Sequence, residues 1–361
     1  MMPKTNAIVY CEGAFNTPNG KTAHGLVRFT RRYSVLAVVD SRYQGKDAGE
    51  VLDGAPTGIP VAGSVEEAVR LSREKGQAPT HFVVGLAPDG GRLGPAARRD
   101  VRTAISLGLN VDCGLHDFLS EDSELRALAD SLGVAIRDVR KPPPPSELHF
   151  FTGAIDRVRA LKVAVLGTDS AVGKRTTAWK IVDGFSERGY RSEMIGTGQT
   201  AWLQGAKYGI LLDALVNDFL TGEIEHAVVT AWDEERPDVI VIEGQGGLLN
   251  PAYPGGYEII AAARPDVIVL QHAPARKAYD GFPQYPIQPL AKQIEALEVI
   301  SGKPVAAIAV NHEDIPREQI GLVCAAITQL TGLPAADVLI HGPAILIDAL
   351  EKHALSKKTR D

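Results

Sequence analysis

Short apolar runs alternate with amphipathic segments along the first part of the chain. The runs Ala7–Cys11, Ser34–Asp40 and His81–Ala87 are rich in β-branched residues, which is typical of strands buried on both faces of a parallel sheet. The segment from Ser64 to Gly76 starts with a capping serine, carries glutamate early and ends on glycine, so it predicts a helix. The same grammar predicts helices over 98–108 and 123–133 and strands over 109–114 and 134–139. This alternation predicts a Rossmann-like α/β domain.

The alternation starts again further along the chain. Strands are predicted over 162–167, 190–196, 238–244, 266–273 and 305–311, and helices over 176–189, 210–232 and 289–302. A turn is predicted at "TGQT", residues 197–200. Apolar strands separated by helices predict a second α/β domain with a doubly wound, mostly parallel sheet.

The segment "KPPPPSE", Lys141 to Glu147, separates the two halves. Four consecutive prolines favour a stiff, extended backbone and cannot continue a helix. We therefore predict a Rossmann-like domain over residues 1–146 and a second domain over 147–361. The length of 361 residues also favours two domains over one.

Composition narrows the class of protein. A formal net charge of −6, without a basic stripe, argues against nucleic acid as the main partner. Three cysteines lie far apart without metal-ligand spacing, which is typical of reduced thiols in the cytoplasm. No signal peptide or membrane span is indicated, so we expect a cytoplasmic protein without a membrane partner.

The first domain lacks the fingerprint of a dinucleotide site. The sequence after its first strand, "CEGAFNTPNGKTAHG", contains no GxGxxG, although Asp40 ends the second strand as a ribose-binding acid would. An NAD site therefore competes with a simpler hypothesis, in which this domain helps to shape one wall of a cleft.

The strongest motif opens the second domain. "GTDSAVGK", Gly167 to Lys174, matches GxxxxGK between a predicted strand and a predicted helix. Its glycines allow backbone N–H groups to face a phosphate, the helix N-terminus favours an anion, and Lys174 adds a positive charge. The residues that we expect to bind the phosphates are Gly167, Thr168, Asp169, Ala171, Val172, Gly173, Lys174, Arg175, Thr176 and Thr177.

The residue after Lys174 is unusual. In ordinary nucleotide-binding loops that residue is Ser or Thr and supplies a hydroxyl to magnesium, but here it is Arg175. Thr176 lies one residue further round the first turn, which rotates a side chain by about 100°. Arg175 either neutralises phosphate oxygens without a metal or points to solvent.

Three further loops follow predicted strands of the same sheet. Glu243 ends one strand and is followed by Gly244, Gly246 and Gly247, which would let the backbone pass close to a ligand. "TGQT" follows another strand, and "QHAPAR" a third. Because the carboxyl ends of parallel strands share one edge, these loops and the glycine loop predict one site.

Candidate roles follow from residue chemistry. Glu243 and His272 are candidate catalytic bases, His272 because an ordinary imidazole titrates near neutral pH. Arg276 suits recognition of a carboxylate or phosphate. We expect Gln199, Gln245 and Arg276 to bind substrate, and we predict no resident metal.

Several motifs together resemble a widespread bacterial family long catalogued as a domain of unknown function and often labelled NAD-dependent epimerase/dehydratase. They are "GTDSAVGKRTTA", "GTGQT", "DALVNDFLTGEIEHAV", "VIEGQGGLLNPAY" and "VLQHAPAR", with "KTAHG" and "RDVRKPP" in the first half. The resemblance spans nearly the whole chain. Members include D-glutamate N-acetyltransferases, and the glycine loop and "EGQGG" are more distantly similar to dethiobiotin synthetase.

The resemblance implies transfer of acetyl from acetyl-CoA to an acidic amino acid, D-glutamate above all, in D-amino-acid catabolism. The pyrophosphate and 3′-phosphate of coenzyme A would occupy the glycine loop. It also implies a homo-oligomer, a dimer or larger. The alternative is an ATP- and magnesium-dependent kinase or ligase acting on a small carboxylate, and a third hypothesis is a sensor that binds nucleotide without turnover.

Overall fold

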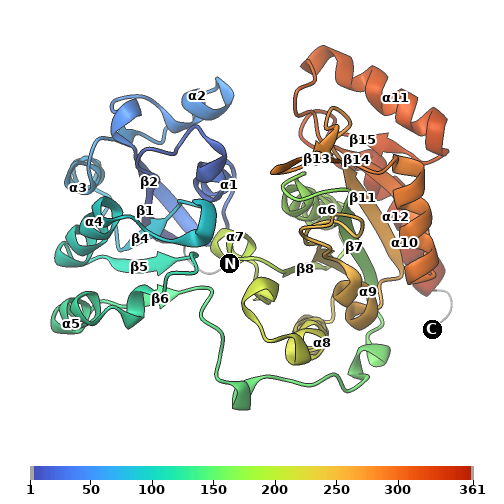
Figure 1. Ribbon diagram of the computed structural model, residues 1–361, viewed down its shortest axis with the longest axis horizontal. Coiled ribbons are helices and arrows are strands. Elements are labelled where there is room, and N and C mark those ends of the chain that lie inside the picture. Colours follow the sequence, from blue (N-terminus) through green and yellow to red (C-terminus); the bar gives the residue numbers. More distant parts are fainter. Residues whose placement is uncertain (1–3, 359–361) are drawn as a thin grey trace. The chain divides into compact units, whose positions relative to one another are not determined.

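The computed structural model describes residues 4–358, and the chain divides into two compact units (Figure 1). The first unit is Met1–Pro142 with Gln199–Ala206, and the second is Pro143–Gly198 with Lys207–Asp361. The predicted ranges 1–146 and 147–361 do not foresee that Gln199–Ala206 belong to the first unit. This segment is held there because the Gln204 amide donates to the carbonyls of Gly25 (2.8 Å) and Phe29 (3.0 Å).

The first unit is a six-stranded parallel sheet with the order β3-β2-β1-β4-β5-β6, the strand order of a Rossmann fold. Its strands are β1 Thr5–Tyr10, β2 Tyr33–Val39, β3 Val61–Ala62, β4 His81–Val84, β5 Asn110–Cys113 and β6 Ile136–Asp138. Its helices are α1 Lys21–Arg28, α2 Ala48–Asp53, α3 Val65–Glu74, α4 Pro95–Ser106, α5 Ser123–Leu132 and α7 Gln199–Gln204. The predicted Rossmann-like architecture is confirmed.

Alternate residues of β1 enter two separate cores, as a doubly covered sheet requires. Ile8 and Tyr10 pack in one cluster, which receives apolar side chains of α3, α4 and α5. Ala7 and Val9 pack in the other, with side chains of α1 and with Leu203 of α7. The strands therefore read as continuous apolar runs because both of their faces are buried.

The predicted capping residues lie at the ends of the helices. The Ser64 hydroxyl accepts a hydrogen bond from the Glu67 N–H at the start of α3. Gly133 ends α5 in the left-handed conformation, with φ 67°.

The aspartate at the end of β2 is fully buried and already bound. The Asp40 carboxylate accepts hydrogen bonds from Arg42 Nη2 (2.6 Å), Arg42 Nε (3.0 Å) and the Phe15 N–H (2.9 Å). A carboxylate with these partners has little capacity left for the hydroxyls of a ribose. The structure thus gives no support to a nicotinamide dinucleotide at this strand end.

The second unit holds a seven-stranded parallel sheet, ordered β15-β14-β11-β7-β10-β8-β9, and an antiparallel hairpin, β12–β13. The strands are β7 Leu161–Gly167, β8 Ser192–Gly196, β9 Tyr208–Gly209, β10 Val239–Glu243, β11 Val267–His272, β12 Ala278–Tyr279, β13 Phe282–Pro286, β14 Val305–Val310 and β15 Ala335–Ala336. The helices are α6 Lys174–Glu187, α8 Asn217–Glu235, α9 Tyr257–Ala263, α10 Leu290–Ser301, α11 Ile320–Thr331 and α12 Ala344–Lys358. The predicted doubly wound sheet is confirmed.

Two sequence predictions for the chain between β8 and β10 are wrong. The helix predicted over 210–232 begins only at Asn217, because Leu215 and Val216 are extended, with ψ of 149° and 135°. Asp213 lies in a short 3-10 turn instead. The turn predicted at "TGQT" ends at Gly198, since Gln199 starts helix α7.

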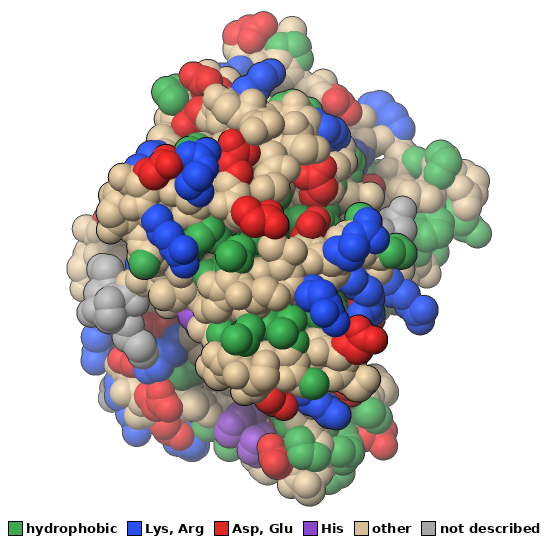
Figure 2. Space-filling view, turned by 90° about the vertical axis from the view of Figure 1, so that its left-hand side faces the viewer, with side chains coloured by type: hydrophobic (Ala, Val, Ile, Leu, Met, Phe, Trp, Pro, Cys, Tyr) green, Lys and Arg blue, Asp and Glu red, His purple; other side chains and the backbone are tan. Residues whose placement is uncertain are grey.

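The length and polarity of the helices and the charges on the surface are relevant to possible partners. Among residues 4–358, no helix is both long and apolar enough to cross a bilayer. On the face that Figure 2 shows, Lys and Arg side chains lie among Asp and Glu side chains. Such a mixture is typical of a solvated protein surface.

The segment after the proline linker is bound along α8. Buried Glu225 accepts hydrogen bonds from Thr152 N (2.6 Å), Thr152 Oγ1 (2.8 Å) and Ile155 N (3.1 Å). Gly222 allows close approach, since a Cβ there would lie 1.9 Å from the His149 carbonyl oxygen. Because both atoms belong to backbone, neither can move away without disturbing the packing, so only glycine fits at this position.

We therefore expect Gly222→Ala to lower the free energy of unfolding by about 1–3 kcal/mol, because the linker must move away from α8. Urea unfolding followed by circular dichroism measures this. Gly321→Ala on α11 is the matched control: nothing lies within 4 Å of its added Cβ, so stability should hold or rise. Equal stabilities of the two variants would contradict the close approach.

Candidate functional site

The candidate site lies at the carboxyl edge of the second unit's sheet. The strands β11, β7, β10 and β8 are consecutive neighbours in that sheet and run parallel, so the loops that follow them share one edge (Figure 1). Open α/β sheets bind ligands at this edge. The loop after β14 joins the group through Asn311 and Glu313, which the sequence analysis did not single out.

The glycine loop joins β7 to α6. Gly173 precedes the helix with φ 104°, and Ala171 is also left-handed, with φ 52°. A Cβ at Gly167 would lie 2.9 Å from Lys174 Nζ, so glycine here makes room for the lysine side chain. The backbone thus has the tight turn and helix N-terminus of a phosphate-binding loop.

Lys174 is buried at the centre of this loop. Its Nζ donates to the carbonyl oxygens of Asp169 (2.7 Å) and Gly246 (2.7 Å). Burial lowers the pKa of Lys174 to about 8, although the charges of Glu243 and Asp169 act in the opposite direction. The amine is therefore charged at neutral pH but close to titrating.

Asp169 fixes the shape of the loop. Its carboxylate, fully buried, accepts hydrogen bonds from Asn250 Nδ2 (2.8 Å), Arg276 Nη1 (2.9 Å) and the N–H groups of Ser170 (2.7 Å) and Asp280 (2.9 Å). These four donors saturate both oxygens. Both oxygens of Asp169 are therefore occupied by protein donors, and its predicted contact with a phosphate stays a prediction.

Arg276 is the second structural member of this network. Besides Asp169, its guanidinium donates to the Ser170 carbonyl (2.7 Å) and, through Nη2, to Glu313 (2.6 Å). The side chain is 13% exposed. The predicted contact with a substrate carboxylate would have to compete with these bonds.

A magnesium ion at this loop would need a hydroxyl ligand from the first turn of α6, where Arg175, Thr176 and Thr177 lie. Arg175 occupies the place of the metal-binding hydroxyl, and its Nε is buried without a hydrogen-bond partner among the described residues. Thr177 Oγ1 is committed to Gln271 Oε1. The Thr176 hydroxyl has no such hydrogen bond among the described residues, but it lies one residue after the position that usually binds magnesium. The residues present therefore do not fit the usual magnesium site of a nucleotide-binding loop.

Glu243 lies beside both cations of the loop. Its Oε2 accepts from the Thr197 N–H (2.9 Å), and Thr197 Oγ1 accepts from Gln245 Nε2 (2.9 Å). Burial raises the pKa of Glu243, while the nearby charges of Arg175 and Lys174 oppose the rise. The structure thus brings Glu243 and Gln245 together with the glycine loop.

The glycines after Glu243 serve backbone packing. A Cβ at Gly244 would lie 2.4 Å from the Val165 carbonyl oxygen, and one at Gly247 2.8 Å from that of Gly167. At Gly246 it would lie 2.0 Å from the Tyr253 carbonyl oxygen, in a left-handed conformation with φ 50°. These glycines therefore make room for neighbouring backbone, and the predicted close approach of a ligand stays a prediction.

His272 lies at the end of β11. Its Nδ1 is 3.1 Å from Thr168 Oγ1, and burial lowers its pKa to about 4. The imidazole is therefore neutral at physiological pH and a much weaker base than its unperturbed value implies. Thr168 is fully buried beside it.

Gln199 starts helix α7 and is assigned to the first unit, so its predicted contact with substrate stays a prediction. It belongs to the first unit, where its side chain lies against Gly114: a Cβ on Gly114 would be 2.8 Å from Gln199 Cγ. The sequence analysis placed it after β8 with the other loops. The difference arises because α7 packs into the core of the first unit through Leu203.

Three amides of the site, buried Asn250 and Gln271 and half-buried Asn311, were not identified from the sequence. Asn250 holds Asp169, Gln271 holds Thr177, and Asn311 Nδ2 donates to the Val172 carbonyl (2.8 Å). Asn250 and Gln271 lie inside motifs that had been recognised, but an amide carries no sign of its partner. Only the fold shows that all three support the glycine loop.

Both units of the chain match domains of a known protein family. Residues 149–347 match a P-loop domain described as a domain of unknown function, DUF1611, and residues 41–142 match its Rossmann-like N-terminal domain. A D-glutamate N-acetyltransferase of Tritonibacter scottomollicae is 29% identical over 286 residues, 78% of this chain and 84% of that protein. One of a Pseudoalteromonas species is 29% identical over 272 residues, 72% of this chain and 78% of that protein.

A solved structure is similar over almost the whole chain. The crystal structure of a DUF1611 family protein from Anabaena variabilis matches with a TM-score of 0.89 and 29% identity, covering 97% of this chain and 100% of that one.

Proposed function

This chain belongs to the DUF1611 family, and from that premise we propose that it transfers the acetyl group of acetyl-CoA to the amine of an acidic amino acid, D-glutamate above all. The names of the two curated relatives support the reaction class. The proposal rests on two cations, buried Lys174 and half-buried Arg175 with its buried Nε, at a phosphate-binding loop whose residues do not fit magnesium.

Coenzyme A suits such a loop. Its pyrophosphate oxygens would accept hydrogen bonds from the Lys174 ammonium and from the backbone N–H groups at the start of α6. They would replace the two carbonyl oxygens to which Lys174 now donates. Arg175 would supply further positive charge, where a nucleoside triphosphate would need a metal. The Arg175 Nε without a partner offers an additional donor for a phosphate oxygen.

The two candidate bases differ in strength. Acetyl transfer requires a base that removes a proton from the substrate ammonium. Burial raises the pKa of Glu243 above its usual range, whereas it lowers that of His272 to about 4. Glu243 is therefore the stronger base of the two, but it lies beside the cations that would bind the pyrophosphate, at the opposite end of the pantetheine arm from the acetyl group. We therefore assign the base to neither residue, and His272 contacts Thr168.

Calorimetric titration with acetyl-CoA, and separately with ATP plus magnesium, tests the proposal. We expect micromolar binding of acetyl-CoA that is unchanged by EDTA, followed by acetylation of D-glutamate detected by release of free thiol. Binding of ATP that requires magnesium, with no response to acetyl-CoA, would refute the acetyltransferase and restore the kinase or ligase hypothesis.

The affinity for acetyl-CoA should fall above pH 8. The free Lys174 amine loses its proton as pH rises through its pKa of about 8, whereas bound phosphate favours the protonated form. Binding then requires proton uptake, and affinity decreases by up to about tenfold per pH unit. Titrations at pH 7, 8 and 9, in buffers with different ionisation enthalpies, measure both effects.

Lys174→Arg is the control for this pH dependence, because guanidinium stays charged throughout the range. Its affinity should be flat between pH 7 and 9. A flat profile for the wild-type protein, without proton uptake, would contradict the assignment of the phosphate contact to Lys174.

A further inference from the structure

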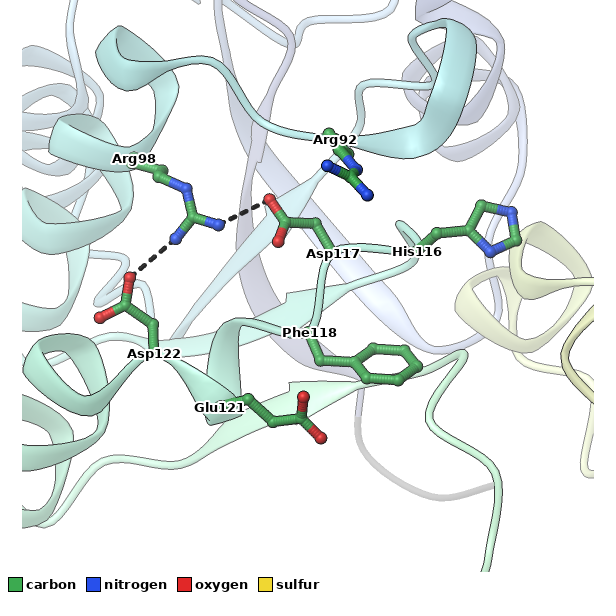
Figure 3. Close-up of a pocket in the computed structure, with 7 residues that line it drawn as sticks. All are labelled: Arg92, Arg98, His116, Asp117, Phe118, Glu121 and Asp122. Atoms are coloured by element: carbon green, nitrogen blue, oxygen red, sulfur yellow. Dashed lines mark hydrogen bonds and ion pairs between the residues drawn. The ribbon is translucent and has the colours of Figure 1, made fainter.

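A pocket of about 420 Å³ lies in the first unit, at the carboxyl ends of two neighbouring strands (Figure 3). The loop after β4 contributes Arg92, and the loop after β5 contributes His116, Asp117, Phe118 and Glu121. Ligands of open α/β sheets bind at this edge. The volume is near the lower end of the range of small-molecule sites, which favours a small ligand over a dinucleotide.

One side of the pocket is a closed set of ion pairs. Arg98 donates to Asp117 (2.7 Å) and to Asp122 (2.8 Å), as the dashed lines in Figure 3 show. Asp117 uses Oδ2 for this bond and for the Leu93 N–H (3.3 Å). Arg98 is therefore neutralised within the protein and positions Asp117.

Arg92 differs from Arg98 in this respect. Arg92 is exposed, and none of the side chains that the structure describes forms an ion pair with it. The neighbouring imidazole of His116 lies over Gly91, which is left-handed with φ 62°: a Cβ there would be 2.6 Å from His116 Cδ2. A guanidinium without an ion-pair partner among the described side chains is suited to bind a carboxylate.

The same pocket offers negative charge for an ammonium group. Glu121 is 62% exposed and contacts only the tip of Lys141, at 3.1 Å, among the charged groups described. Asp117 has a second carboxylate oxygen, which carries no bond to the other residues drawn in Figure 3. Phe118 supplies an apolar surface between these charges.

We propose that this pocket binds a free amino acid as a zwitterion, with its carboxylate on Arg92 and its ammonium on Glu121 and Asp117. Opposite charges across a small pocket discriminate an amino acid from a simple dicarboxylate, which lacks the ammonium. The choice of D-glutamate as the amino acid rests on the proposed function; the binding site itself rests on the pocket.

The test is calorimetric titration of the full-length protein with D-glutamate in the absence of acetyl-CoA. We expect Arg92→Ala to weaken binding at least tenfold, while Arg99→Ala, which removes an exposed arginine of α4 outside the pocket, leaves it unchanged. Glu121→Gln should weaken binding of D-glutamate but not of glutarate, which has the same two carboxylates and no amine.

The outcomes separate this proposal from the proposed function. Equal affinities of the Arg92→Ala and Arg99→Ala variants, or no binding of D-glutamate to the wild-type protein, would overturn the pocket assignment. Acetyl-CoA affinity, measured on the same Arg92→Ala protein, should equal that of the wild type. If the wild type binds D-glutamate through Arg92 but does not bind acetyl-CoA, the pocket stands and the acetyltransferase proposal fails.

Discussion

Replacing Lys174 with methionine is expected to weaken acetyl-CoA binding at least about 30-fold. The substitution removes a buried charge from the phosphate site, and losing one partner of a buried charge pair costs about 2–5 kcal/mol. At about 1.4 kcal/mol per tenfold, this corresponds to roughly 30- to 3,000-fold in affinity. Calorimetric titration at pH 7 measures the change, and acetylation of D-glutamate at low acetyl-CoA should fall with it.

The control for this prediction lies on the same helix. Lys180→Met removes a partly exposed lysine of α6 away from the glycine loop, so acetyl-CoA affinity should not change. Circular dichroism establishes whether both variants are folded. If Lys174→Met binds acetyl-CoA like Lys180→Met, the ligand's phosphates do not occupy the glycine loop.

Asp169→Ala is expected to cause the largest loss of stability, about 3–5 kcal/mol. The substitution leaves the Arg276 guanidinium, 13% exposed, without one of its two carboxylates, and it leaves the donors of Asn250 and Asp280 unpaired. Urea unfolding should show a lower midpoint with little change of slope. Asp218→Ala, at an exposed position of α8, should cost no more than about 1 kcal/mol.

A double-mutant cycle then separates the ion pair from the rest of the network. In the Arg276→Ala background, Asp169→Ala should cost less, because no buried guanidinium is left behind. Additive effects would mean that Asp169 acts through its backbone and amide donors alone. A stability of Asp169→Ala equal to that of Asp218→Ala would refute the structural role.

Local patterns were sufficient to predict the architecture of both units. Strands such as Val163–Leu166 are apolar and short, and the glycine loop follows one of them directly, so each can be recognised within a few residues. The same holds for the cap at Ser64, which acts on Glu67 three residues later. Such features depend little on the rest of the fold.

The partners of the site residues depend on distant parts of the chain. Asp169 was expected to bind a phosphate, yet its bonds run to Arg276 and Asp280, more than 100 residues away. Gln199 follows β8 in sequence but packs with Gly114 of the first unit. The raised pKa of Glu243 and the lowered pKa of His272 both follow from burial, which residue type alone does not reveal.

Because of helix α7, the chain cannot be divided into two complete units by a single cut. The chain passes from one unit to the other three times, at Pro142, Gly198 and Ala206, so a cut in the proline linker does not divide it into two self-sufficient fragments. A fragment 1–142 would lack Leu203 in its core, and a fragment 143–361 would carry α7 without the helix α1 that it packs against. Each half expressed alone would therefore leave apolar surface of α7 or of the first unit's core uncovered.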